Sequence, residues 1–165
     1  MALKALAGPH LSLVSFGVAQ VAMDIEPLVH MLRGDSTHHG FVHTYLGATV
    51  VGFVALPLAR AISLRLARLW NQEFRDGSMS WLVEPVSRSW WPIVVGTFAG
   101  TYSHVLLDSM LHADLAPLAP LSQGNAMLDV LSFAGIHVFC VLSGILGLCA
   151  WAVAQRVWRS RGASD

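Results

Sequence analysis

The sequence carries little charge for its length. Of its 165 residues only 12% are charged and 55% are hydrophobic, whereas soluble chains carry about 25% charged residues. A water-soluble domain of this size exposes much of its surface and needs charge to cover it. The composition therefore favours lipid as the solvent for much of the chain. The net charge is zero with neutral histidines, which argues against a nucleic-acid partner.

Cysteine is scarce, and a typical export signal is missing. Cys140 and Cys149 are the only cysteines and lie nine residues apart. On a helix they point to opposite sides, so we interpret them as packing residues that neither bridge nor share a zinc ion. The first apolar run follows a single basic residue, Lys4, and leads into Asp24 without a small-residue cleavage site. We expect this segment to remain as a helix.

Four apolar segments approach or exceed the length of about 20 residues that a helix needs to cross a bilayer. The sequence predicts an all-α, polytopic membrane bundle of about four transmembrane helices, forming one domain over residues 1–165. The spans are expected at about 10–32, 41–62, 90–112 and 130–157, with a polar linker at 63–89. Because Asp24, Glu26 and Pro27 interrupt the first span, we expect that helix to be broken near Asp24–Pro27.

Basic residues are distributed unevenly over this topology. Four spans place both termini and the linker on one side of the membrane, together with nine of the ten Lys and Arg residues, and leave Arg33 on the other. The side richer in basic residues is the cytoplasmic one. We therefore expect a multi-pass protein of the inner (plasma) membrane with both termini in the cytoplasm.

Carboxylates and imidazoles gather toward the extracytoplasmic face. They come from the end of the first span, the start of the second and the outer half of the third. These residues are Asp24, Glu26, His30, His38, His39, His43, His104, Asp108 and His112. Ionisable groups at membrane depth are costly and usually mark a functional interior, so their convergence predicts a site.

The spacing of the histidines favours a metal site. His39 and His43 are four residues apart, as are His104, Asp108 and His112 in turn. Residues at this spacing share one face of a helix, and two imidazoles so placed can hold one metal ion.

The acidic pair Asp24 and Glu26 needs a different geometry. Residues two apart on a helix point in different directions. We expect Pro27 to hold Glu26 in extended backbone, where residues two apart face the same way. The broken helix would then present both carboxylates to one site.

Structural roles are the alternatives for several of these groups. A lone histidine in a membrane helix is usually a hydrogen-bonded packing residue, which is our interpretation of His10, His38 and His137. His30 is left open between a ligand and an interfacial residue, and His112 between direct contact with an ion and support of a ligand. For the whole set, the alternative is a structural polar network.

Three strings resemble a known family. They are Asp24-Ile25-Glu26-Pro27, His39-Gly40-Phe41-Val42-His43-Thr44 and Ser103-His104-Val105-Leu106-Leu107-Asp108-Ser109. In combination and order they resemble the bacterial and archaeal membrane-bound, metal-dependent hydrolases, over roughly residues 15–130. The resemblance implies metal ligation by Asp24, Glu26, His39, His43, His104 and Asp108. Glu26 stands where many relatives have a second Asp, which changes the reach of the side chain but not its charge.

The residue types and the resemblance together predict a membrane-embedded, metal-dependent hydrolase. Mixed carboxylate and imidazole ligands suit zinc, and also manganese or iron, and six ligands are enough for two ions. We expect cleavage of an ester or phosphoester in an amphiphilic, lipid-like substrate at the extracytoplasmic face. Asp108, Glu26 and His112 are the expected catalytic residues, and membrane lipids are the other expected partners.

Two rival functions remain at this stage. Membrane-buried His and Asp also build pathways for metal ions or protons, although the third span offers only Thr97, Thr101 and Ser103 on the cytoplasmic side of His104. A bundle stapled by a structural metal is the other rival. The sequence leaves the oligomeric state open.

Overall fold

The chain is all-α, with four helices of which the first is bent, in the residues that the computed structural model describes (10–35, 39–76, 78–83 and 88–162). The elements are α2 (Leu13–Met23) continued by α3 (Ile25–Arg33), η2 (Phe41–His43), α4 (Tyr45–Glu73), η3 (Ser80–Leu82), α5 (Trp91–Ser109) and α6 (Phe133–Gly162). The η elements are short 3₁₀ turns. This confirms the predicted fold class. Lys4 and His38 lie outside the described residues.

The bend in the first helix lies at Asp24, between α2 and α3. The break was predicted, but the predicted extended backbone at Glu26 is wrong, because Glu26 is helical. Pro27 occupies the first turn of α3, where its missing N–H removes no hydrogen bond. Asp24 and Glu26 therefore point in different directions.

The pair His39 and His43 precedes a helix and does not lie on it. α4 starts at Tyr45 because Thr44 caps it, accepting a hydrogen bond from Gly47 N at 2.9 Å. His39 lies before η2 and His43 is its last residue, so the predicted helical spacing is wrong for this pair. Their rings are still neighbours, with centroids 4.8 Å apart.

Two helices of the described chain are long and apolar enough to cross a membrane: α4 and the Phe133–Ala154 part of α6. α4 runs to Glu73, well into the predicted linker. α2 has only 11 residues, and α5 has 19 and includes His104 and Asp108. Length and apolarity thus indicate two crossings, and the other two stay a prediction.

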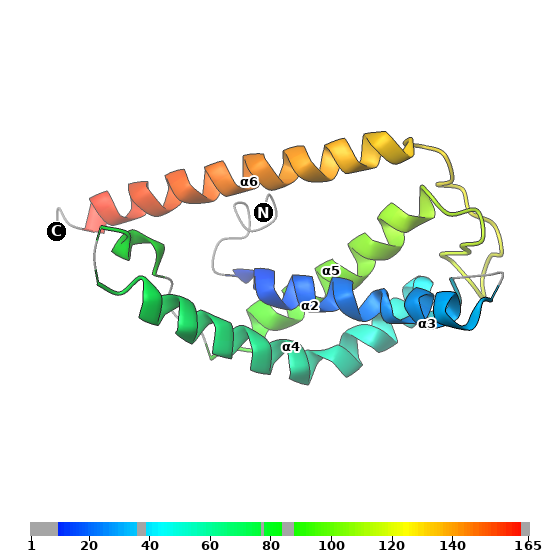
Figure 1. The fold of residues 1–165 in the computed structure, drawn as a ribbon, viewed down its shortest axis with the longest axis horizontal. Coiled ribbons are helices and arrows are strands. Elements are labelled where there is room, and N and C mark those ends of the chain that lie inside the picture. The colour runs from blue at the N-terminus through cyan, green and yellow to red at the C-terminus, as the bar shows by residue number, and fades with distance from the viewer. Residues whose placement is uncertain (1–9, 36–38, 77, 84–87, 163–165) are drawn as a thin grey trace.

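α2, α4 and α5 pack together, whereas α6 runs along one side of them (Figure 1). α5 approaches α2 closely through its glycines: a Cβ on Gly100 would lie 2.7 Å from Phe16 O, and Gly96 lies one turn earlier. Small residues at this spacing allow membrane helices to pack closely. The approach brings His104, one turn after Gly100, against the polar end of α2.

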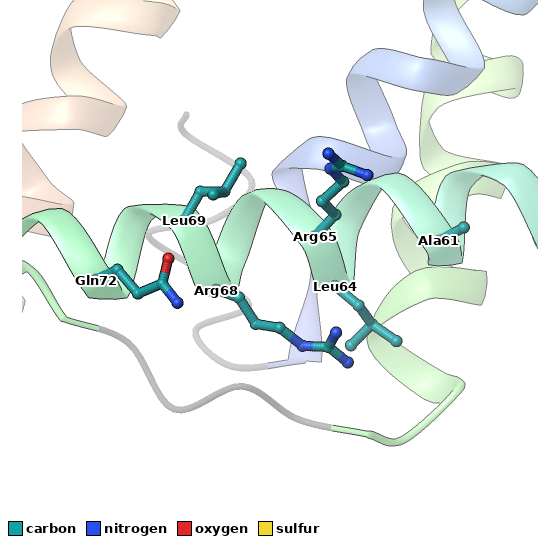
Figure 2. A pocket seen from close by; sticks show the side chains of 6 residues that line it. All are labelled: Ala61, Leu64, Arg65, Arg68, Leu69 and Gln72. Atoms are coloured by element: carbon teal, nitrogen blue, oxygen red, sulfur yellow. The ribbon is translucent and has the colours of Figure 1, made fainter.

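A groove on the C-terminal half of α4 lies away from the histidines. Its lining residues are Ala61, Leu64, Arg65, Arg68, Leu69 and Gln72 (Figure 2). It contains cations and apolar side chains but no carboxylate or imidazole. Nearby, Arg60 stacks on the Trp90 ring at 4.6 Å, an arrangement typical of the membrane–water interface. The groove therefore lies toward the other end of α4 from His43.

Candidate metal centre

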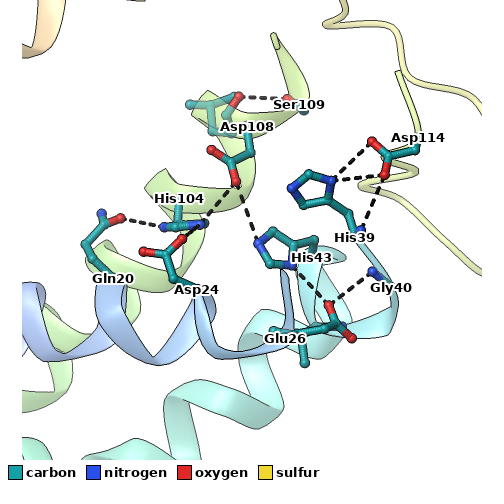
Figure 3. Close-up of polar contacts among 12 residues, drawn as sticks. Gln20, Asp24, Glu26, His39, Gly40, His43, His104, Asp108, Ser109 and Asp114 are labelled. Atoms are coloured by element: carbon teal, nitrogen blue, oxygen red, sulfur yellow. Dashed lines mark hydrogen bonds and ion pairs between the residues drawn. The ribbon is translucent and has the colours of Figure 1, made fainter. Parts of the chain in front are cut away.

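One end of the bundle brings together polar side chains of α2, α3, the 39–43 segment and α5 (Figure 3). His104 on α5 is buried, and its Nδ1 lies 2.7 Å from Gln20 Oε1. Gln20 Nε2 donates to Gly100 O and Ser103 Oγ, both at 3.2 Å. The amide oxygen therefore faces His104 and accepts its Nδ1–H. In the neutral ring the lone pair is then on Nε2.

Glu26 orients His43 in the same way. His43 is fully buried, and its Nδ1 lies 3.1 Å from Glu26 Oε2. An ionised carboxylate can only accept, so Nδ1 donates and Nε2 carries the lone pair. Glu26 also accepts from Gly40 N at 3.1 Å and from Val42 N at 3.3 Å. One carboxylate thus ties α3 to η2 and fixes the imidazole.

His39 is held by Asp114, which follows α5. Its Nδ1 lies 3.1 Å from both Asp114 oxygens, and its backbone N donates to Asp114 Oδ2 at 3.3 Å. Figure 3 shows the other ring nitrogen of His39 on the side of Asp108. His112 packs against the His39 ring with centroids 4.3 Å apart. Because α5 ends before His112, the predicted helical stripe through His112 is wrong.

Two of these imidazole Nε2 atoms, those of His43 and His104, are buried without a hydrogen-bond partner. Asp108 Oδ2 lies 3.6 Å from His43 Nε2 and 3.1 Å from His104 Nε2, and Asp24 Oδ1 lies 3.4 Å from His104 Nε2. A lone pair facing a carboxylate oxygen is unfavourable unless a cation or proton lies between them. Ligand atoms about 2.0–2.1 Å from one tetrahedral zinc ion are about 3.3 Å apart, so each of these pairs, taken by itself, has the separation of two ligands of one ion.

The cluster offers more than one set of ligands. Two sets with ligand atoms within 4.8 Å of one another are His39, His43 and Asp108, and His39, His112 and Asp114. The set of His39, His43 and Asp108 is called the inner set below. Asp108 also contacts His104, so its carboxylate can serve two neighbouring ions. Imidazole nitrogens and carboxylate oxygens suit zinc, manganese or iron. The side chains therefore fit a divalent transition metal.

The cluster is open to solvent on the side of Asp24. The Asp24 side chain is 66% exposed, that of Asp108 is 23% exposed and that of His43 is fully buried. Structural metal sites are closed by protein ligands, whereas catalytic sites keep a position for water or substrate. Accessibility beside Asp24 is the arrangement expected of the second kind.

The structure brings together the six predicted metal residues Asp24, Glu26, His39, His43, His104 and Asp108, with the Glu26 carboxylate on the Nδ1 side of His43. Sequence analysis missed Gln20, although it is a polar residue in an apolar helix, one turn before Asp24.

The other histidines of the described residues lie apart from this cluster. His30 pairs with Asp35 at 2.7 Å in the turn after α3, and His10 is exposed at the start of the described chain. His137 Nδ1 lies 2.8 Å from Phe133 O, one turn earlier on α6. These contacts are compatible with packing and interfacial roles.

Comparison with protein families matches residues 7–163 of the chain to the YdjM inner membrane protein family. No curated protein and no solved structure matches the chain. An inner-membrane location agrees with the apolar lengths of α4 and α6. The matched segment covers nearly the whole chain, including every residue of the polar cluster. The chain therefore belongs to the YdjM inner membrane protein family.

Proposed function

We propose that this protein is a metal-dependent hydrolase that cleaves an ester or phosphoester in an amphiphilic, lipid-like substrate at the extracytoplasmic face of the inner membrane. The observation that carries the proposal is the pair of buried, unpartnered Nε2 atoms of His43 and His104, which face one oxygen of Asp108. A divalent ion among His39, His43 and Asp108 would satisfy the His43 nitrogen, and a second ion beside Asp108 would satisfy that of His104. Zinc is the ion we expect, and the shared position of Asp108 favours two ions.

Different residues of the chain would have different roles at such a site. A bound divalent ion would supply Lewis acidity and activate water near neutral pH. Asp24 and Asp108 contribute negative charge that holds the ion, and exposed Asp24 borders the side from which substrate enters. His112, beside His39 at the rim, is placed to move a proton as general acid or base.

Exposed apolar side chains near the cluster favour an amphiphilic substrate. Ile25, Leu28 and Leu32 are 57%, 52% and 80% exposed and share one face of α3, the helix that also carries Glu26. Phe41 is 55% exposed beside His43. An amphipathic helix of this kind lies in the membrane interface. A lipid-like substrate could keep its chain on this surface while its polar bond reaches the metal centre.

The test of the proposed function is hydrolysis of a panel of phospholipids, lysolipids and water-soluble phosphoesters by zinc-loaded protein in detergent. We expect the wild type to cleave an amphiphilic member of the panel and Asp108→Ala to lose at least about 100-fold in kcat/KM, since one removed carboxylate takes away a ligand and its charge. His137→Ala is the matched control and should keep wild-type activity.

A metal or proton carrier is the second candidate, because buried hydroxyls lie in α2 as well as in the third predicted span. Ser15, Thr97 and Thr101 are fully buried in α2 and α5. Ser15 Oγ donates to Ser12 O at 2.9 Å and Thr101 Oγ1 donates to Phe98 O at 3.3 Å. Because these hydroxyls bond to nearby backbone and not to one another, a proton relay through them is disfavoured. If zinc-loaded protein cleaved nothing but moved zinc into dye-loaded liposomes, the carrier would replace the hydrolase.

The proposed topology places both termini and the 63–89 segment in the cytoplasm. Its basis is the asymmetry of nine basic residues against one. In a background in which Cys140 and Cys149 are replaced by Ala, Asp35→Cys should react with an impermeant maleimide added outside spheroplasts, and Arg75→Cys should react only after lysis. Equal labelling of both cysteines before lysis would contradict this orientation and the extracytoplasmic site with it.

A further inference from the structure

We infer that Gln20, Glu26 and Asp114 are positioning residues of the metal centre, each holding one imidazole by its Nδ1–H so that Nε2 faces the ion. The inference rests on the proposed metal centre and deepens it. It removes Glu26 from the ligand set that the sequence predicted and adds Gln20, which no motif contains. Metal-binding histidines characteristically donate their second ring N–H to an acceptor that fixes the tautomer and the ring plane.

The contacts of Gln20 are compatible with this role only in one orientation of its amide. Its Nε2 is occupied by the Gly100 carbonyl, which can only accept. Its Oε1 therefore receives the Nδ1–H of His104 at 2.7 Å. Since His104 Nε2 has no hydrogen-bond partner and lies among the carboxylates of Asp24 and Asp108, the amide sets the ring in its ligating tautomer.

The contacts of Glu26 leave little of its carboxylate for an ion. Oε2 receives Gly40 N and His43 Nδ1, both at 3.1 Å, and Oε1 receives Val42 N at 3.3 Å. A Cβ on Gly40 would lie 2.8 Å from Glu26 Oε1, so the backbone at Gly40 lies close against the carboxylate. Glu26 is thus engaged with η2 and lies on the side of His43 opposite Nε2.

Asp114 holds His39 by two groups, the ring Nδ1 and the backbone N. Both contacts place the carboxylate on the Nδ1 edge of the ring. The Nε2 edge of His39 is left for the inner set with His43 and Asp108. The three anchors therefore share one geometry, although they come from α2, α3 and the segment after α5.

Cobalt(II) titration of the detergent-purified protein tests this assignment without using activity. The d–d absorption reports the midpoint of binding and, at saturation, the number and type of ligands. We expect Gln20→Leu, and Gln20→Met as a second variant, to raise the midpoint about 10- to 100-fold while keeping the saturating wild-type spectrum. Glu26→Gln and Asp114→Asn keep an oxygen that can accept Nδ1–H, so their midpoints should rise less and their spectra should also be retained.

Two reference variants separate positioning from ligation. Asp108→Asn, which removes a ligand, should change the saturating spectrum. Thr97→Val removes a buried hydroxyl from α5 two turns before His104 and should leave both midpoint and spectrum unchanged. A Glu26→Gln spectrum like that of Asp108→Asn would make Glu26 a ligand, and wild-type titration of both Gln20 variants would remove Gln20 from the centre; either result overturns the inference. Absence of any cobalt spectrum in the wild type would instead overturn the proposed metal centre itself.

Discussion

Replacing Asp108 by Asn is expected to lower the affinity of the purified protein for zinc by more than about 100-fold. Loss of a partner that only supports a ligand costs 10- to 100-fold, and Asp108 is placed as a ligand itself. Its Oδ2 is the one oxygen that both buried imidazoles face, at 3.6 Å from His43 Nε2 and 3.1 Å from His104 Nε2. Asn keeps the shape of the side chain but removes the charge that makes the carboxylate a good ligand.

The measurement is zinc stoichiometry by elemental analysis after equilibration at a fixed free concentration of the metal. Its matched controls are His10→Ala and His137→Ala, which remove imidazoles outside the cluster and should leave bound zinc unchanged. Retention of the full wild-type zinc content by Asp108→Asn would show that the inner cluster is a polar network that does not depend on an ion.

The fold class and the meeting of the polar residues could be predicted because both depend on local patterns. Apolar length indicates helices in lipid whatever their packing. His104 and Asp108 are one turn apart within α5, and their side chains indeed meet, with Nε2 and Oδ2 3.1 Å apart. The gathering of the polar residues at one end of the bundle was predicted from helix order alone, and the structure indeed brings Asp24 and His43 to the same place.

The structure differs from the predictions where two local signals compete. A proline three residues after a helix break was taken to end the helix, but in the first turn of α3 it is tolerated, and Glu26 therefore turns toward His43. The spacing of His39 and His43 suited a helix, but Thr44 caps α4 one residue later. Both errors lie at an element boundary, and each changed the expected direction of a side chain.

The positioning residues Gln20 and Asp114 could not be predicted from spacing. Gln20 meets His104 across 84 positions in sequence, and Asp114 meets His39 across 75. Such contacts depend on how closely α2 and α5 pack and on the path of the chain after α5. A polar amide in an otherwise apolar helix is a signal that it has a partner, because an unpaired polar group at that depth is costly, but it does not say which partner.

Removing the metal is expected to lower the thermal stability of the protein by roughly 8–16 °C. A ligand at 1,000 times its dissociation constant stabilises the folded state by about 4 kcal/mol, and each kcal/mol shifts the midpoint by about 2–4 °C in a chain of this size. The effect should be large here because the ligands come from α2, the 39–43 segment and α5, so that one ion links three separate parts of the chain. Apo protein would leave Asp24, Asp108 and the two unpartnered imidazoles facing one another without a cation.

A fluorescence-based thermal shift in detergent, with chelator and then with zinc restored, measures this effect. The shift should be reversible in the wild type and absent in Asp108→Asn when zinc is restored to a concentration that loads the wild type but not this weakened site. It should also shrink in acid, because protons compete with the metal for the imidazoles. An equal shift in Asp108→Asn would trace the effect to zinc bound elsewhere. A wild type that bound zinc with no gain in midpoint would show that the ion does not link the helices, and would place it at the exposed rim near Asp114 instead of between His43 and His104.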